Sequence, residues 1–294
     1  MSNNDNKNSF AVFGLLFGAL CWGIVWYPYR IMSDAGVSGV VSSFYTYSIA
    51  VVLAAIYFSK HWRGVFQLPL SIILLSLVAG WTNLSYVLAI IDGEVMRVML
   101  LFYLSPLWTL ILAHFWLKEE THLAGMIAIV TSLLGAYIML YDPLVSGFPV
   151  PRNTAEWLGL SSGFGFALTN VMTRKSVHLS LRAKSFAIWI GVIAVCLIAM
   201  PLMQVSLLSP AMLTPANWLV MGLIAVLLIA ATLFVQYGVT LIKATRASVL
   251  FLFELVVAAI AAYFLTDETM NLYEWIGGTL IVVASVFAAF NHKD

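Results

Sequence analysis

The chain has 294 residues, of which 62% are hydrophobic and only 9% are charged, and its formal net charge at pH 7 is +1. So few charged side chains cannot cover the surface of a water-soluble protein of this length, which excludes that class and predicts an integral membrane protein. The near-zero net charge gives no support to a nucleic-acid or acidic partner.

Ten apolar segments are long enough to cross a hydrocarbon core, which takes about 20 helical residues. The first follows a polar start and has no cleavage-like end, so we interpret it as a retained span and not a signal peptide. In chain order the predicted spans are Phe10–Met32, Val37–Phe58, Leu70–Ile91, Val95–Leu117, Leu123–Tyr141, Trp157–Thr173, Phe186–Leu208, Trp218–Ile242, Ala247–Leu265 and Leu272–Phe290. The predicted fold is therefore an all-α membrane protein with ten transmembrane helices.

The positive charges predict the orientation of these spans. With a cytoplasmic N-terminus, three of the fourteen Lys and Arg residues lie outside: Arg30, Arg97 and Arg152. The other eleven are then cytoplasmic, which is a strong positive-inside bias. Both termini are predicted to be cytoplasmic, in the inner membrane of a bacterium.

An internal duplication divides the chain into two halves. Shifting the sequence by 148 positions places Arg97–Thr121 on Thr245–Thr269, and at a shift of 145 the Gly14-x-x-x-Gly18 spacing matches that of Gly159 and Gly163. The longest connection, near Asp142–Glu156, separates five spans from five. We predict one five-helix repeat in residues 1–148 and a second in residues 149–294.

Because five is an odd number, the second repeat must enter the membrane from the opposite side. Such inverted repeats are the structural basis of alternating access in many secondary transporters, in which a central cavity opens to one side and then to the other.

Several short motifs in this arrangement resemble the drug/metabolite transporter superfamily, EamA type. They are Trp22-Gly23, Ser105-Pro106 and the acidic turns Lys118-Glu119-Glu120 and Thr266-Asp267-Glu268. The resemblance covers the whole chain, is greatest to YddG-like aromatic and neutral amino acid exporters, and implies a ten-helix bundle around a central cavity that exports small metabolites. One departure is Glu254, which stands where the first repeat has Pro106; the ninth span is therefore predicted to lack the kink of the fourth.

Glu254 and Pro106 are the most informative single residues. Glu254 lies midway along an apolar span, where an ionised carboxylate costs roughly 3 kcal/mol. It is predicted to bind a substrate ammonium, to relay a proton, or to hydrogen-bond a neighbouring helix. Pro106 frees the carbonyl group of Phe102, so it marks either a hinge or a kink that serves packing alone.

Other candidate binding residues follow from helical spacing. Polar side chains in a membrane helix point inward, toward either a pore or a neighbouring helix. Asn83 and Tyr86 share a face of the third span, Asn170 lies one turn from Phe166, and Thr232, Gln236 and Thr240 form a stripe in the eighth. Of the aromatic residues, the following are predicted to lie deepest and to serve either core packing or an aromatic pocket: Trp22, Trp26, Trp81, Tyr103 and Trp189.

The sequence also lacks several functional signatures. No Lys or Arg lies in the central third of a predicted span, which argues against strongly anionic solutes. No nucleotide-binding loop, metal-ligand set or disulfide framework is recognisable, and the only cysteines are Cys21 and Cys196. We therefore expect neither a cofactor nor direct use of ATP.

Taken with the resemblance, the sequence predicts a secondary transporter that exports small neutral or zwitterionic solutes, with large neutral amino acids favoured. The alternatives are an exporter of drugs or lipophilic cations, a membrane-embedded enzyme acting on lipid-linked substrates, and a scaffold or sensor without transport. The expected partners are a small-molecule solute and membrane lipid, with the protein a monomer or a weak homodimer.

Overall fold

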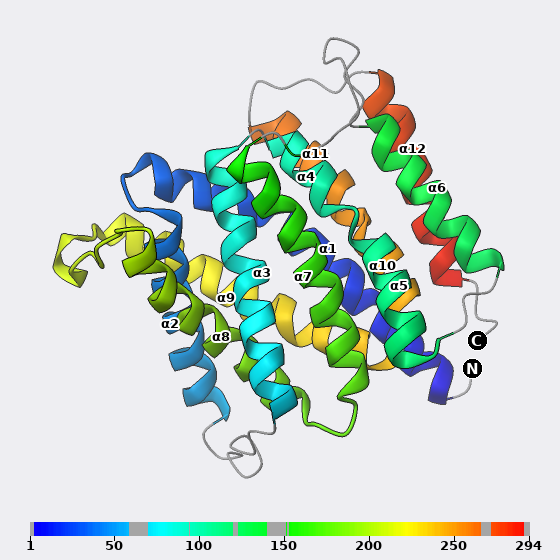
Figure 1. Ribbon diagram of the computed structural model, residues 1–294, viewed down its shortest axis with the longest axis horizontal. Coiled ribbons are helices and arrows are strands. Elements are labelled where there is room, and N and C mark those ends of the chain that lie inside the picture. Colours follow the sequence, from blue (N-terminus) through cyan, green and yellow to red (C-terminus); the bar gives the residue numbers. More distant parts are fainter. Residues whose placement is uncertain are drawn as a thin grey trace.

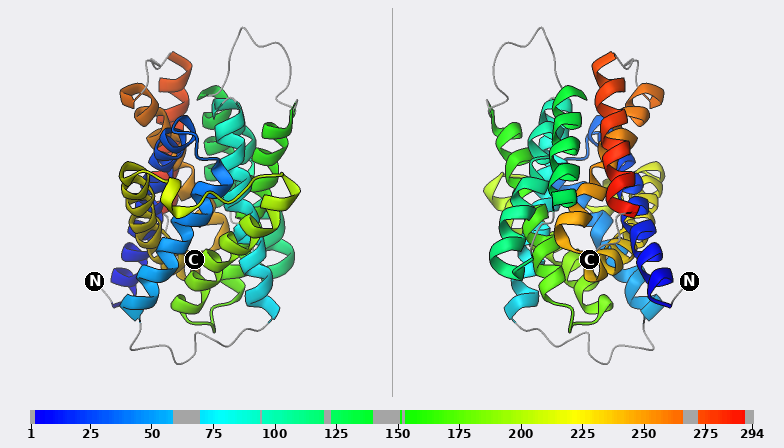
Figure 2. Two further views of the ribbon diagram at one scale, coloured as in Figure 1. Left: turned by 90° about the vertical axis from the view of Figure 1, so that its left-hand side faces the viewer. Right: turned by 90° about the vertical axis from the view of Figure 1, so that its right-hand side faces the viewer.

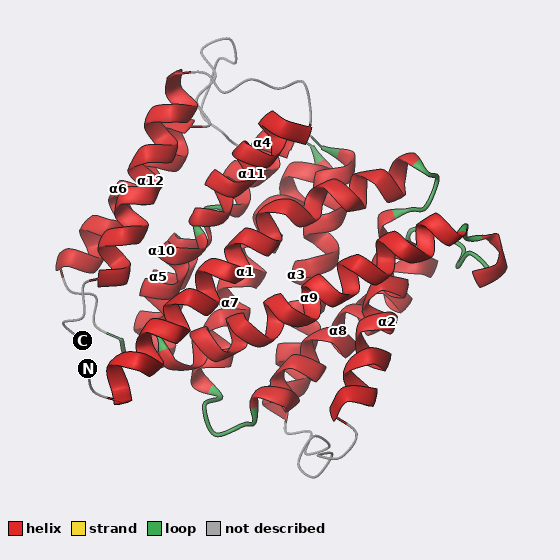
Figure 3. Cartoon of the chain, turned by 180° about the vertical axis from the view of Figure 1, so that it is seen from behind, coloured by secondary structure: helices red, strands yellow, loops and turns green. Residues whose placement is uncertain are grey.

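The computed structural model describes residues 3–58, 70–93, 95–119, 123–139, 151, 153–265 and 272–290, and all regular elements within them are helices (Figure 3). They are α1 (Asn3–Asp34), α2 (Gly39–Phe58), α3 (Leu70–Asp92), α4 (Val95–Phe102), α5 (Ser105–Leu117), α6 (Leu123–Met139), α7 (Thr154–Lys175), α8 (Leu181–Leu202), α9 (Pro215–Leu241), α10 (Ala244–Phe251), α11 (Phe253–Leu265) and α12 (Leu272–Phe290), with a 3-10 turn at Pro210–Met212. The pairs α4–α5 and α10–α11 each form one interrupted span. The described helices therefore make the ten predicted spans.

The ten spans form one bundle in which helices of the two halves interleave. Helix α1 packs against α9 and α11, just as α7 packs against α3 and α5. Helices α6 and α12, the last of each half, pair along one edge (Figure 1). The start of α1 and the end of α12 lie at the same end of the bundle (Figures 1 and 2). Matching contacts in the two halves confirm the predicted fold of two five-helix repeats.

The outer surface of the bundle is apolar. Large hydrophobic side chains on the outside include Phe115, Leu123 and Phe264, each more than 70% exposed. Six described helices, counting α10 and α11 as one, meet the length and composition needed to cross a membrane. These exposed side chains contact lipid in an integral membrane protein, because an apolar surface of this extent is not compatible with water.

The ninth span is interrupted, contrary to the prediction from the absence of proline. Helix α10 ends at Phe251 and α11 begins at Phe253, so the break is at Leu252. The Leu252 N–H bonds to Val249 O at 3.1 Å and the Leu255 N–H to Leu252 O at 3.1 Å. Tighter turns of this kind replace the regular i to i−4 bonds and allow the chain to change direction without a proline.

The fourth span has the same break at the position 148 residues earlier. There the Leu104 N–H bonds to Leu101 O at 3.3 Å, and the Leu107 N–H bonds to Leu104 O at 3.0 Å. Pro106 lies at the start of α5, where its missing N–H costs little. The freed Phe102 carbonyl faces Gly163 of α7, whose lack of a side chain lets the two backbones touch. This kink therefore faces protein and not lipid.

The predicted seventh span was placed too late in the chain. Helix α8 runs from Leu181 to Leu202 and not from Phe186 to Leu208. Ser180 begins it by accepting a hydrogen bond from the Ala183 N–H at 3.1 Å. Apolar residues after Leu202 extended the hydropathy signal beyond the true end. Lys184, assigned from the sequence to a connection, is thus part of the helix.

Helices α3 and α8 approach each other closely at Gly191. A Cβ atom at position 191 would lie 1.9 Å from the Ser76 carbonyl oxygen, a distance that requires the helices to separate. At Gly222 of α9, by contrast, no atom lies within 4 Å of such a Cβ.

We expect Gly191→Ala to destabilise the folded protein by about 2 kcal/mol, because an overpacked contact forces the backbone to shift. Thermal unfolding of the purified protein in detergent measures this loss. Gly222→Ala is the matched control and should unfold at or above the wild-type temperature, since alanine favours a helix. Equal stability of the two variants would contradict the packing of α3 on α8.

Candidate functional site

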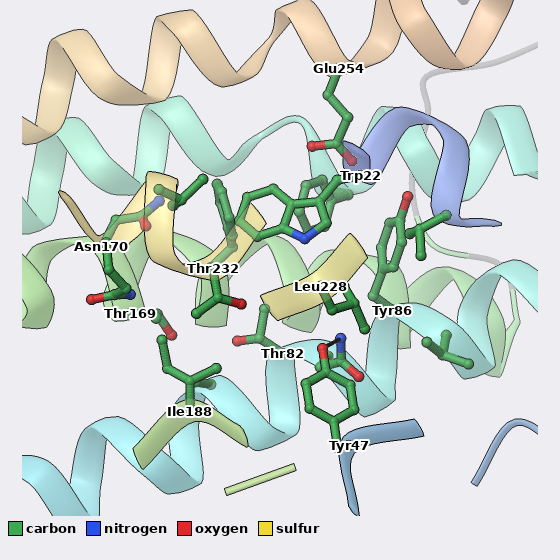
Figure 4. Close-up of a pocket in the computed structure, with 18 of the residues that line it drawn as sticks. Trp22, Tyr47, Thr82, Tyr86, Thr169, Asn170, Ile188, Leu228, Thr232 and Glu254 are labelled. Atoms are coloured by element: carbon green, nitrogen blue, oxygen red, sulfur yellow. Dashed lines mark hydrogen bonds between the residues drawn. The ribbon is translucent and has the colours of Figure 1, made fainter. Parts of the chain in front are cut away.

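A cavity lies in the middle of the bundle. It encloses about 840 Å³, its opening included. Its walls come from α1, α2, α3, α4, α7, α8, α9 and α11, so both halves contribute (Figure 4). The central cavity of the predicted fold is therefore present, and apolar and polar side chains both line it.

Glu254 supplies the charged group of this cavity. It is the second residue of α11, directly after the break at Leu252, and the residue is 2% exposed. Its carboxyl group faces the cavity beside Trp22 and Tyr86 (Figure 4). The Tyr86 hydroxyl is oriented toward this carboxyl group but makes no hydrogen bond of normal geometry. No cationic side chain of the described residues pairs with Glu254.

Aromatic rings form a continuous wall next to Glu254. Phe166 of α7 lies at its centre: its ring centroid is 5.0 Å from Phe251, 5.4 Å from Phe102 and 5.6 Å from Trp22. Tyr86 extends the wall, 5.1 Å from Phe102. We call these five residues the aromatic wall. Rings in edge-on and tilted contacts of this kind hold one another in place, so they present a rigid apolar surface.

Amide groups line other parts of the cavity. The Asn83 Nδ2 donates to the Tyr47 hydroxyl at 2.7 Å, which fixes both side chains. Asn170 and Gln236 are buried, and the Asn170 Nδ2 and the Gln236 Oε1 have no hydrogen-bond partner. An unpaired buried polar group costs about 1–3 kcal/mol. These two amides therefore favour a ligand, or water, that completes their hydrogen bonds.

The structure brings six of the seven predicted binding residues together. Around the cavity it places Trp22, Asn83, Tyr86, Asn170, Gln236 and Glu254. Tyr103 is buried at the break in the fourth span and does not line the cavity, and neither does Pro106. Trp189 is fully buried outside the cavity lining, where its Nε1 donates to Thr232 Oγ1 at 3.2 Å.

The prediction that Trp81 lies deep in the protein is wrong. Its side chain is 44% exposed on the outer surface of α3. Trp81 sits in the middle of an apolar span, and hydropathy alone does not distinguish the lipid-facing side of such a helix from the side facing the bundle. The neighbouring Thr82 and Asn83 line the cavity instead.

Several residues that shape the cavity are not singled out by the sequence. Phe102 and Phe166 belong to the aromatic wall, and Tyr47 holds Asn83. Phenylalanine occurs throughout an apolar membrane sequence, so its presence carries no positional signal. Tyr47 does not start a row of polar residues along α2, and its partner Asn83 lies 36 residues away in the sequence, so no local pattern marks it.

One end of the bundle is basic, and polar contacts tie its helices together. We define this basic end by Lys118, Arg174, Lys175, Arg182 and Lys243. Here the Glu119 carboxylate accepts a hydrogen bond from the Ala244 N–H at 3.1 Å, and so caps α10 of the other half. The Arg174 Nε lies 3.6 Å from Glu119 Oε1, and its Nη1 donates to the Thr240 carbonyl oxygen. These contacts tie α5 to α7, α9 and α10.

Burial raises the pKa of Glu119 above its ordinary value of 4.5, and this effect exceeds the lowering by Arg174 and by the Ala244 N–H. Burial of Glu119 at this end therefore favours its neutral, protonated form. Below the ordinary pKa, Glu119 is neutral whether it is buried or exposed, so burying it carries no cost for a charge. As pH rises through the raised pKa, the buried carboxyl group also ionises, and this contribution to the stability of the closed arrangement is lost.

Comparison with known proteins connects this architecture to a family. A profile of EamA-like transporters matches residues 9–141 and again residues 153–290. The chain belongs to the EamA-like transporter family. The resemblance seen in the sequence is thereby confirmed at the level of the family and of the drug/metabolite transporter superfamily.

Two further comparisons agree with this EamA-like assignment. Over 212 residues, the chain is 26% identical to an uncharacterised transporter of Archaeoglobus fulgidus, which covers 70% of this chain and 72% of that protein. A known crystal structure superimposes with a TM-score of 0.76, covering 95% of this chain and 96% of that one. The two sequences are 15% identical, so this likeness concerns the fold alone. This EamA-like protein is a membrane transporter for a small molecule.

Proposed function

We propose that this transporter exports aromatic and other large neutral amino acids from the cytoplasm, as a secondary transporter that works by alternating access. The observation that carries the proposal is Glu254, a buried carboxyl group that faces the cavity beside the aromatic wall and has no cationic partner among the described residues. A solute ammonium would supply the missing charge, and the wall would pack against an apolar side chain.

The unpaired amides favour a zwitterion over a lipophilic cation. Glu254 and the aromatic wall would suit either class of solute. A solute carboxylate can accept a hydrogen bond from the Asn170 Nδ2, whereas a lipophilic cation leaves this donor unpaired at a cost of about 1–3 kcal/mol. Multidrug export is therefore the second candidate function.

The same cavity gives less support to an enzyme. Catalysis on a lipid-linked substrate needs two or more ionisable groups converging on one point. Of the described residues that line the cavity, Glu254 is the one with a carboxylate, and Lys, Arg and His are absent from the lining. The cavity has the features of a binding site, and a non-enzymatic role fits them best.

Counterflow in proteoliposomes tests the proposed function. Vesicles that contain only this protein are preloaded with unlabelled phenylalanine and diluted into labelled phenylalanine. The proposal predicts transient accumulation of label, with tryptophan as an effective competitor. Accumulation of a lipophilic cation, without exchange of amino acids, would favour the multidrug alternative. Exchange of neither class by folded protein would overturn the proposed substrate.

We further propose that the basic end faces the cytoplasm of a bacterial cell, because positive charge accumulates on that side of inner-membrane proteins. A single cysteine at Ser180, in a background without Cys21 and Cys196, should then resist a membrane-impermeant thiol reagent in whole cells. A cysteine at Ser209, which follows α8 at the opposite end, should react. Both serines are exposed, so the reversed labelling pattern would overturn this orientation.

Opening of the cytoplasmic end requires release of the Glu119 cap on α10. The readout is the reaction of a cysteine placed at Asn170 with a thiol reagent supplied from the cytoplasmic side. We expect Glu119→Ala to increase the rate of this reaction about 5-fold or more, because losing a cap costs about 1 kcal/mol. Glu119→Gln is the matched control. Its amide oxygen can still accept from the Ala244 N–H, so the end should remain closed. Equal reactivity of the two variants would show that the ion pair carries the closure.

A further inference from the structure

Lys184 occupies an unusual position just beneath the cavity. It is the fourth residue of α8 and is 0% exposed, although the sequence placed it in a basic connection. A charged lysine at a helix end of a membrane protein normally extends to the interface, where water solvates the ammonium group. The Lys184 side chain is instead enclosed by the bundle.

The bonding of Lys184 is incomplete. Its Nζ donates to the Thr240 hydroxyl, which in turn donates to the Gln236 carbonyl oxygen at 2.6 Å. An ammonium group has three protons to donate, and no carboxylate of the described residues lies within ion-pair distance of Lys184. Its charged neighbour is Arg174, which is also a cation. A buried charge without a counter-ion costs several kcal/mol.

Glu119 does not supply this counter-ion. Its carboxylate is engaged with the Ala244 N–H at 3.1 Å and with Arg174 at 3.6 Å. Among the described residues, this end of the bundle therefore holds two buried or partly buried cations, Arg174 and Lys184, beside the one carboxylate of Glu119, an excess of positive charge. Such an excess attracts an anionic group.

The lining of the cavity begins one helical turn from Lys184 along α8. Ile188, four residues after Lys184 on α8, lines the cavity, and so does Gln236, four residues before Thr240 on α9. One turn of helix rises about 5.4 Å, so the backbone of Lys184 lies about one turn below the lining. Lys184 and Glu254 are thus a basic and an acidic side chain at different depths of the bundle, one below the cavity and one in its lining.

We propose that Lys184 is the counter-ion for the carboxylate of the solute as it enters from the cytoplasm, so that the transporter selects zwitterions by holding both of their charges. This inference rests on the proposed function, because it assumes a solute with an ammonium and a carboxylate. Lys184 lies near the start of α8, so the absence of Lys and Arg from the central third of the spans does not argue against this role. Selection of the carboxylate takes place nearer the cytoplasm, at the base of the cavity.

Inside-out vesicles that expose the cytoplasmic side test this role with two solutes. Phenylalanine carries an ammonium, a ring and a carboxylate, and 2-phenylethylamine lacks only the carboxylate. Lys184→Met should raise KM for phenylalanine about 10-fold or more, because a charge-assisted hydrogen bond is lost, and should change KM for 2-phenylethylamine less than about 2-fold. Lys184→Arg, which keeps the charge, should restore most of the affinity for phenylalanine.

Thr240→Val provides the control for structure, since it removes the hydrogen bond of Lys184 and leaves the charge. Thermal unfolding shows whether each variant is folded. Equal losses for the two solutes in Lys184→Met would assign Lys184 to closure or folding and overturn its role in selection. Transport of neither solute by the wild type would overturn the proposed function and this inference with it.

Discussion

Glu254→Gln is expected to lower the transport rate of phenylalanine at subsaturating concentration about 100-fold, while the protein folds normally. The glutamine keeps the size and hydrogen-bonding capacity of the side chain but cannot pair with a solute ammonium. Loss of a buried charge-assisted interaction of about 3 kcal/mol corresponds to this factor. Counterflow measures the rate, and thermal unfolding shows that the variant is folded.

The control for this variant is a buried carboxyl group outside the cavity. Glu156 is 3% exposed in the first turn of α7, where its backbone N–H bonds to Asn153 Oδ1 at 2.9 Å. Glu156→Gln should transport phenylalanine at nearly the wild-type rate. If Glu254 served only to hydrogen-bond a neighbouring helix, the glutamine would replace it and transport would survive in both variants.

Phe166→Leu is expected to weaken binding of phenylalanine and tryptophan about 10-fold, because the ring at the centre of the aromatic wall is lost while most of the side-chain volume is kept. Aromatic contacts add about 0.5–1.5 kcal/mol to the burial of apolar area. The concentration for half-maximal counterflow measures the change. A smaller neutral amino acid such as alanine, which does not reach the wall, should bind with nearly unchanged affinity.

Phe164 offers a matched control on the same helix. It lies two residues from Phe166, is 42% exposed on the outer side of α7, and contacts Trp108 at a ring-centroid distance of 5.7 Å. Phe164→Leu should leave the affinity for aromatic amino acids unchanged. If both variants weaken binding to the same degree, the effect belongs to the stability of α7 and not to the cavity.

The spans and their pairing into halves could be predicted from the sequence because the bilayer imposes a strict length on each helix. Glu254 is also recognisable from the sequence, because a carboxylate inside an apolar span is costly and therefore rare. The other five predicted lining residues are recognisable by helical spacing of polar groups or by aromatic character in the interior of a span. These signals depend on local sequence.

The break at Leu252 and the burial of Lys184 depend on contacts between distant parts of the chain. No proline marks the break in the ninth span; it is recognisable only by its match to the break at Leu104 in the other half. Hydropathy assigned Lys184 to a connection because an isolated lysine near a span end is usually exposed. Its enclosure results from packing of α8 beside α9, which places Thr240 against it.

The glycine spacing shared by the two halves also shows the limits of local sequence. Gly14 and Gly18 of α1 lie against Phe234 and Val235 of α9. Gly163 of α7, which corresponds to Gly18 in the sequence, lies instead against Phe102 of α4. Equal spacing thus provides close contact in both halves, but with helices that are not equivalent.

Equilibrium binding of labelled phenylalanine to the purified protein in detergent tests the central claim most directly. The account predicts saturable binding at one site per chain, displaced by tryptophan, lost in Glu254→Gln and weakened in Phe166→Leu. Binding of phenylalanine to Glu254→Gln with wild-type affinity would contradict the assignment of the cavity as an amino acid site.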